Sequence, residues 1–151
     1  MNSHRKGSAD LSGRKIPVRR CRWIQIPRII DAKDGVVSVA EGKNVPFAIR
    51  RVYYIYELKY DRSHRGEHAH KKLEQVLFCV HGQVTLSLDD GLQRHEITLD
   101  QPHIGVYLGP DVWIVMKKFR RDCVLLVLAS DKFRESDYIR DYRRFIARVR
   151  G

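Results

Sequence analysis

The chain has 151 residues, 43% hydrophobic and 31% charged, and this composition excludes a wholly disordered protein. One domain is expected at this length, and no run of about 18 apolar residues exists that could cross a membrane. The basic N-terminus lacks the apolar segment of a secretory signal, so we expect a cytoplasmic protein. Three cysteines without CxxC spacing, Cys21, Cys79 and Cys123, fit buried free thiols.

The net charge of +11 lies mainly at the two ends of the chain. Residues 1–22 hold seven Lys or Arg and one acidic residue, and residues 132–151 hold seven and three. The body between them is nearly neutral, and the N-terminal segment offers neither aromatic stacking nor base readout. We therefore expect a flexible basic tail over 1–22 and a single domain over 23–151. Neither nucleic acid nor a membrane is expected as a partner, and a nucleic-acid arm is the least favoured interpretation.

Short runs of β-branched and aromatic residues recur along the body, separated by turn signals. The expected strands are 36–40, 49–58, 73–80, 84–88, 93–99, 105–108, 112–116 and 124–129. The Asp89-Asp90-Gly91 sequence predicts a hairpin, while Gly82 after His81 is expected to end a strand. Only residues 136–146 have apolar side chains at helical spacing. The pattern predicts an all-β sandwich, jelly roll or small barrel with a short C-terminal helix.

Two histidines stand two residues apart in the segment Arg65-Gly66-Glu67-His68-Ala69-His70. In a strand, both side chains would point to the same face. Neutral imidazoles suit proton transfer near pH 7, and two histidines with a carboxylate, here Glu74, are also a common ligand set for non-haem iron. A surface pair without function is the third interpretation.

The spacing from Gly66 through both histidines and Glu74 to Gly82 resembles the first motif of the cupin superfamily. Residues 105–116 contain the Gly-Pro turn of the second cupin motif, but no histidine where its metal ligand would fall. The resemblance implies a cupin-type double-stranded jelly-roll barrel, and the missing ligand favours one with no metal and no other cofactor. A metal-dependent cupin enzyme using His68, His70 and Glu74 is the alternative.

Three tyrosines, Tyr53, Tyr54 and Tyr56, occupy the strand expected over 49–58. Alternation places Tyr54 and Tyr56 on one face and Tyr53 on the other. Tyrosine and arginine can stabilise the oxyanion that forms when a carbonyl moves between adjacent carbons. Packing in the core or in an interface is the other interpretation of each tyrosine.

An ordered series of segments across residues 23–146 resembles the dTDP-sugar 3,4-ketoisomerase family, cupin-fold enzymes of deoxysugar biosynthesis. Besides the histidine motif, the segments are 44–47, 49–56, 88–91, 105–110 with Trp113, 127–130 and 136–142. The resemblance implies conversion of dTDP-4-keto-6-deoxyglucose to a dTDP-3-keto-6-deoxyhexose by histidine-mediated proton transfer through an enediol, without a metal. It also implies a homodimer formed by strand exchange near the N-terminus.

Matching positions carry the family's roles to this chain. The resemblance implies proton transfer by His68 and His70, of which we expect His70 to be the more critical, and a catalytic role for Tyr56. The side chains expected to contact the substrate are Arg51, Tyr54, Arg65, Tyr107 and Trp113.

Two positions depart from the family's pattern. Asp34 stands in the early turn at residues 31–35, where family members often carry arginine. Ile114 follows Trp113, where a polar or basic residue is common. Because both changes could alter the pocket, a non-catalytic sugar-nucleotide-binding cupin remains a further alternative.

Overall fold

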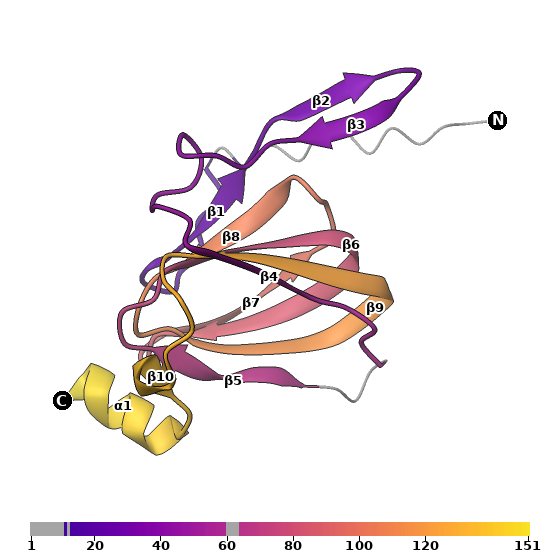
Figure 1. Cartoon of the computed structure of the whole chain (residues 1–151). Helices are drawn as coiled ribbons and strands as arrows, with labels where there is room; N and C mark the ends of the chain where they lie inside the picture. Colours follow the sequence, from indigo (N-terminus) through magenta and orange to yellow (C-terminus); the bar gives the residue numbers. More distant parts are fainter. Residues whose placement is uncertain (1–10, 12, 60–63) are drawn as a thin grey trace.

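The computed structural model describes residue 11, residues 13–59 and residues 64–151. An eight-stranded antiparallel sheet that curls around an apolar core forms the body of the described chain (Figure 1). The strands are β1 (Cys21–Gln25), β2 (Arg28–Asp31), β3 (Gly35–Ser38), β4 (Arg51–Ile55), β5 (Arg65–His70), β6 (Gln75–Asp89), β7 (Arg94–Leu99), β8 (Ile104–Leu108), β9 (Trp113–Ala129) and β10 (Tyr138–Ile139). A 3-10 turn, η1 (Glu135–Asp137), precedes β10, and helix α1 (Tyr142–Arg150) follows it.

Strands β6 and β9 form the centre of the curled sheet. They pair antiparallel over most of their length, from Gln75 opposite Ala129 to Asp89 opposite Trp113. Strand β9 also pairs with β4 and β5, while β6 pairs with β7 and β8, and β1 joins β8. The all-β architecture with a short C-terminal helix, expected from the sequence, is confirmed. No helix among the described residues is long and apolar enough to cross a membrane.

The core lies inside the curl and is filled from the two long strands. Leu77, Leu86 and Leu88 of β6 and Leu125 and Val127 of β9 are at most 1% exposed. Each such side chain contributes about 1.5–3 kcal/mol by leaving water. The packed side chains of β6 and β9 hold β9 in place, and β5 pairs with β9 at the edge of the core.

Gly82 does not end a strand, contrary to the expectation. Strand β6 continues through it, with register shifts against β9 between Cys79 and Thr85. The φ angle of Gly82 is +76°, and a Cβ there would lie 2.3 Å from the carbonyl oxygen of Arg120. Glycine therefore allows a bulge that bends a continuous strand, so two strands expected separately are one.

The described part of the N-terminal segment packs against the core from residue 16 onward. Ile16 and Val18 are buried in the core, and the backbone N–H of Arg19 donates to the Asp90 carboxylate at 2.7 Å. Strand β1 then begins at Cys21. The alternating apolar side chains of this segment, and not its basic residues, determine where it lies. Residues 1–10 and 12 of the expected tail lie outside the described residues.

The C-terminal helix begins at Tyr142 rather than near Ser136. The Asp141 side chain caps it by accepting a hydrogen bond from the backbone N–H of Arg144 at 2.9 Å. The preceding residues instead form η1 and the two-residue strand β10, which pairs with β5 so that Tyr138 lies opposite His70. The C-terminal segment thereby reaches the strand that carries the histidines.

Strands β2 and β3 form a separate hairpin that projects away from the curled sheet (Figure 1). Ile29, Ile30, Val36 and Val37 of this hairpin are 49–62% exposed. An isolated two-stranded hairpin is at best marginally stable in water, and exposed apolar patches commonly mark interaction surfaces.

Candidate active site

Strand β5 carries both histidines between β9 and β10. His68 lies opposite Ile114 of β9, and the pairing shifts register between Gly66 and His68. Gly66 has a φ angle of +83°, and a Cβ there would lie 2.7 Å from the Ile114 carbonyl oxygen, so the close approach of the strands requires glycine. As alternation predicts, the two imidazoles share a face, with ring centroids 4.9 Å apart. The Ile114 side chain itself is buried in the core.

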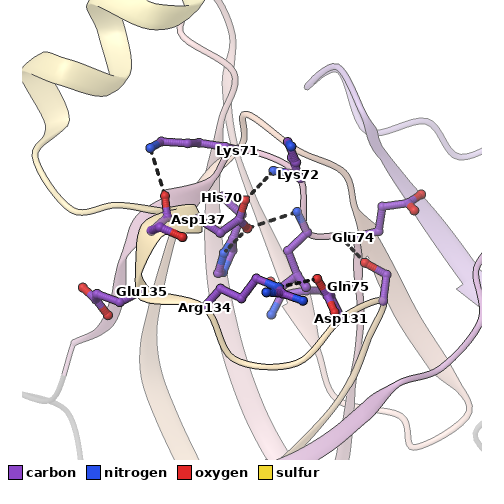
Figure 2. Close-up of polar contacts among 12 residues, drawn as sticks. His70, Lys71, Lys72, Glu74, Gln75, Asp131, Arg134, Glu135 and Asp137 are labelled. Atoms are coloured by element: carbon purple, nitrogen blue, oxygen red, sulfur yellow. Dashed lines mark hydrogen bonds and ion pairs between the residues drawn. The ribbon is translucent and has the colours of Figure 1, made fainter.

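His70 is held by a carboxylate from the C-terminal segment. Its Nδ1 lies 3.2 Å from Oδ2 of Asp137 (Figure 2). Its Nε2 is buried and has no hydrogen-bond partner among the described residues. Burial, and to a smaller extent the neighbouring His68, lower the pKa of His70 to about 4, while Asp137 opposes the shift. His70 is therefore a neutral imidazole near pH 7, with an unused lone pair.

His68 has the same protonation pattern. Its Nδ1 lies 2.9 Å from the carbonyl oxygen of Gly66. Because a carbonyl oxygen only accepts, the ring proton is on Nδ1 and the lone pair is on Nε2. Burial lowers the pKa of His68 as well. Both imidazoles can therefore accept a proton at neutral pH.

Two neighbouring cavities adjoin the histidines. The first has a volume of about 620 Å³ and includes His70 and Asp137, and the second, of about 530 Å³, includes His68 and Arg65. Arg51 and Tyr138 line both. The basic side chains lining the first cavity are Arg50, Arg51, Lys72, Lys132 and Arg134. Three carboxylates, of Glu74, Asp131 and Asp137, also line this cavity, so its five basic side chains exceed the acidic ones by two. A cavity of this size accepts a small molecule, and the net positive charge favours an anionic one.

Two tyrosines outside the predicted set of site residues, Tyr53 and Tyr138, lie beside the histidines. The ring centroid of Tyr138 lies 4.3 Å from that of His70 and 4.9 Å from that of His68. Tyr53 lines the second cavity, and its hydroxyl accepts a hydrogen bond from Gln75 at 2.8 Å. Burial raises the pKa of Tyr53 to about 12, so its hydroxyl keeps a proton that it can donate.

Tyr54 and Tyr56 lie outside both cavities. Their side chains are 62% and 56% exposed, and their rings pack on each other with centroids 5.6 Å apart. Tyr54 lies on the outer face of β4 and Tyr56 directly follows that strand, while Tyr53 faces inward. Within one chain, the structure therefore brings Tyr53 to the histidines in place of the expected Tyr56.

The other expected substrate contacts divide into two groups. Arg51 and Arg65 line the cavities beside the histidines. Tyr107 instead donates a hydrogen bond to Glu74 at 2.7 Å, and Trp113 is buried against the aromatic side chains of α1. Neither Tyr107 nor Trp113 lines the two cavities, and Trp113 has a packing role.

The ligand set of the metal alternative does not converge. The Glu74 carboxylate binds the Tyr107 hydroxyl, and Figure 2 shows its side chain directed away from His70. Among residues 13–59 and 64–151, no group of three or more His, Cys, Asp or Glu side chains is arranged to hold a metal ion. The donor arrangement therefore gives no support to a metal site made from His68, His70 and Glu74.

Asp137 and Tyr138 are the main residues that sequence reasoning did not assign. Both belong to the resembling segment 136–142, but the pattern there was interpreted as the start of a helix. The aromatic and β-branched pair Tyr138-Ile139, between Asp137 and the capping residue Asp141, favours a short strand. This pair is the sequence feature from which β10 could be predicted. No local sequence pattern groups the basic residues Lys72, Lys132 and Arg134, because they come to line one cavity only in the folded chain.

The curled sheet places a buried neutral imidazole beside a cavity large enough for a small molecule. Residues 19–150 match the sequence family described as FdtA: WxcM-like, C-terminal. The chain is 50% identical over 129 residues to a TDP-4-oxo-6-deoxy-alpha-D-glucose-3,4-oxoisomerase from Aneurinibacillus thermoaerophilus, covering 83% of this chain and 92% of that protein. The chain belongs to the FdtA family, and it is an isomerase.

Solved structures agree with this assignment. A histidine-to-asparagine variant of the 3,4-ketoisomerase QdtA from Thermoanaerobacterium thermosaccharolyticum, in complex with TDP-4-keto-6-deoxyglucose, is 41% identical, with a TM-score of 0.84 over 88% of this chain and 96% of that one. The WlaRB TDP-quinovose 3,4-ketoisomerase from Campylobacter jejuni is 40% identical, with a TM-score of 0.81 over 86% and 99%.

A more distant structure shows the fold alone. The RmlC epimerase from Mycobacterium tuberculosis is 15% identical, with a TM-score of 0.69 over 83% of this chain and 70% of that one. With these neighbours, the cupin-like fold class expected from the sequence is confirmed.

Proposed function

We propose that this chain converts dTDP-4-keto-6-deoxyglucose to a dTDP-3-keto-6-deoxyhexose in deoxysugar biosynthesis. The observation that carries the proposal is His70, a buried neutral imidazole whose Nε2 is unused beside a cation-lined cavity. The 50% identical relative is named for the corresponding oxoisomerase activity, which supports the substrate class.

The reaction moves a carbonyl from C4 to C3 of the sugar. A base removes the proton on C3, the C–H electron pair forms the C3–C4 double bond, and the C4 carbonyl oxygen takes a negative charge and then a proton. The C3 hydroxyl loses its proton as the C3 carbonyl forms, and C4 gains a proton, so no atom is gained or lost. His70 and His68 exchange these protons, and the Tyr53 hydroxyl and Arg51 stabilise the developing oxyanion.

The basic side chains of the larger cavity suit the nucleotide diphosphate. Arg51 lines both cavities, which supports a contact of its guanidinium group with both the sugar and the phosphates. Lys72 and Lys132 add further positive charge at the first cavity. Guanidinium groups match phosphate oxygens in geometry, and the ammonium groups act as point charges.

A homodimer formed by strand exchange is part of the proposal. The β2–β3 hairpin exposes Ile30 and Val37, and the outer face of β4 exposes Val52 and Tyr54. A second copy of the chain would cover both apolar surfaces, which supports an exchanged hairpin. Asp34 lies in the turn of the projecting hairpin, so we propose that its departure from the family's arginine acts at the partner's surface.

A cytoplasmic location completes the proposal. The three cysteines are free in the structure, which agrees with a reducing compartment. The nucleotide-linked substrate is also consistent with an enzyme of soluble sugar metabolism.

The deciding experiment is proton NMR of the chelator-treated protein with dTDP-4-keto-6-deoxyglucose in deuterated water. We expect the C3 proton signal to disappear while a 3-keto species accumulates, and the C4 couplings to report the product configuration. An unchanged spectrum with tight binding of the nucleotide sugar would identify a non-catalytic binding protein. Turnover that requires an added metal ion would identify the metal-dependent alternative.

A further inference from the structure

Asp137 is fixed by the fold independently of the histidine that it contacts. Its Oδ1 accepts the backbone N–H of Lys72 at 2.9 Å, and its Oδ2 accepts that of Leu73 at 3.2 Å (Figure 2). The backbone N–H of Lys71 also donates to the Asp137 carbonyl oxygen at 2.9 Å. The carboxylate is therefore oriented by the chain immediately after His70, and its Oδ2 faces Nδ1 of that ring at 3.2 Å.

We propose that Asp137 is the positioning residue of the active site and holds His70 in the tautomer with its proton on Nδ1 and its lone pair on Nε2. The inference rests on the proposed function only for the use of that lone pair as a base. It adds a residue, a geometry and a tautomer to the histidine pair named by the sequence.

The hydrogen bonds that Asp137 accepts support this assignment of the tautomer. An ionised carboxylate only accepts hydrogen bonds, and the backbone amides of Lys72 and Leu73 already donate to both oxygens of Asp137. The opposite tautomer would direct the lone pair of Nδ1 at this carboxylate. Nε2 has no partner among the described residues in either tautomer, so the contact between Nδ1 and the acceptor-only carboxylate of Asp137 decides for the proton on Nδ1.

The charged and titratable groups around His70 come from three other elements and from its own strand. His68 lies beside it on β5, Arg51 on β4, Tyr138 on β10 and Asp137 in η1. Arg51 and His68 disfavour a proton on His70, whereas Asp137, the acidic side chain in contact with the ring among the described residues, favours it. Asp137 therefore orients the ring and also keeps it basic enough to accept a proton.

The first test uses the unmodified enzyme. Nitrogen-15 NMR of the imidazole groups at pH 7, assigned with a His70→Asn variant, distinguishes a protonated from an unprotonated ring nitrogen. We expect a proton on Nδ1 and none on Nε2 of His70. A proton on Nε2 instead would overturn the proposal, and this measurement requires neither substrate nor turnover.

The second test uses Asp137→Asn, with Glu135→Gln as the matched control. Both variants remove one negative charge from η1, but Glu135 pairs with Arg140 and has no contact with His70. An amide can donate to Nδ1, so we expect Asp137→Asn to populate the Nε2–H tautomer and to lower kcat by roughly 10²- to 10⁴-fold, with less than a threefold change in KM. The control should keep kcat within about twofold.

These outcomes separate the inference from the proposed function. If the unmodified enzyme fails to isomerise the substrate, the proposed function fails, while the NMR measurement still decides the tautomer. If Asp137→Asn turns over at the wild-type rate with an unchanged tautomer, the positioning role is wrong. If that variant does not fold, the tautomer in the unmodified enzyme decides alone.

Discussion

Tyr138 lies directly opposite His70 in the β10–β5 pair, and the two rings meet edge to face with centroids 4.3 Å apart. The aromatic ring covers the imidazole on the side of the C-terminal segment. The His70 side chain is consequently 6% exposed. Because exclusion of water is the main reason for the low pKa of His70, this contact determines how the site responds to pH.

Replacing the covering ring should change the titration of His70. In Tyr138→Ala, water reaches the imidazole, so its pKa should rise from about 4 toward 6.5, the ordinary value for histidine. Tyr138→Phe keeps the ring and should leave the pKa of His70 within about half a unit. NMR titration of His70 measures both variants, and equal pKa values in the two would contradict the covering role.

His70 should be more important than His68 for turnover. We expect His70→Asn to lower kcat by roughly 10²- to 10⁴-fold, because it removes the buried lone pair at Nε2. His68→Asn should cause a smaller loss, since His68 is the less deeply buried ring. Single-turnover rates with dTDP-4-keto-6-deoxyglucose provide the comparison. A fully active His70→Asn enzyme would refute the assignment of the base.

The two faces of β4 should differ in their effect on activity. Tyr53→Phe removes a hydroxyl that lines the cavity beside His68, and we expect kcat to fall about tenfold. Tyr56→Phe alters the outer face and should change kcat by less than about twofold. Steady-state kinetics of the two variants compare the losses in kcat. A larger loss in Tyr56→Phe than in Tyr53→Phe would support Tyr56 as the catalytic tyrosine.

The projecting hairpin should control the oligomeric state. Ile30 is 62% exposed. An apolar side chain in this position stabilises the protein only when a partner covers it and removes it from water. We expect Ile30→Asp to shift the proposed dimer toward the monomer in sedimentation equilibrium. Ile30→Val, which keeps an apolar side chain at the same position, is the control and should leave the dimer intact. A monomeric wild-type protein would refute strand exchange.

The bulge at Gly82 should be intolerant of a side chain. A Cβ there would lie 2.3 Å from the backbone oxygen of Arg120, in a left-handed conformation, so we expect Gly82→Ala to lower the free energy of unfolding by about 1–3 kcal/mol. Gly42, whose Cβ would meet no atom within 4 Å, provides the control. Denaturant unfolding of both alanine variants measures the difference, and equal stabilities would contradict the steric argument.

The sequence predicted those features that depend on neighbours in the chain. The Asp89-Asp90-Gly91 turn forms as expected, because Asp90 accepts the backbone N–H groups of Leu92 and Gln93 within the turn. The shared face of His68 and His70 follows equally from strand alternation. Both predictions depend on geometry that spans only a few residues.

Features that depend on distant contacts could not be predicted in this way. Alternation separates Tyr53 from Tyr54 and Tyr56 but does not say which face turns inward. The continuity of β6 through Gly82 depends on its pairing with β9. The contact between His70 and Asp137 joins positions 67 residues apart, and no local pattern indicates such a pair.

Because η1 and β10 pack beside β5 but follow it in the chain, the surroundings of His70 depend on residues that are synthesised after the long strands. The long pairing of β6 with β9 is complete once residue 129 has been made, whereas Asp137 and Tyr138 follow it. A nascent or truncated chain that stops before residue 135 would retain the central pairing but have neither the carboxylate nor the ring that surrounds His70. The carboxylate and the ring that surround His70 are therefore added only after both long strands of the sheet have been synthesised.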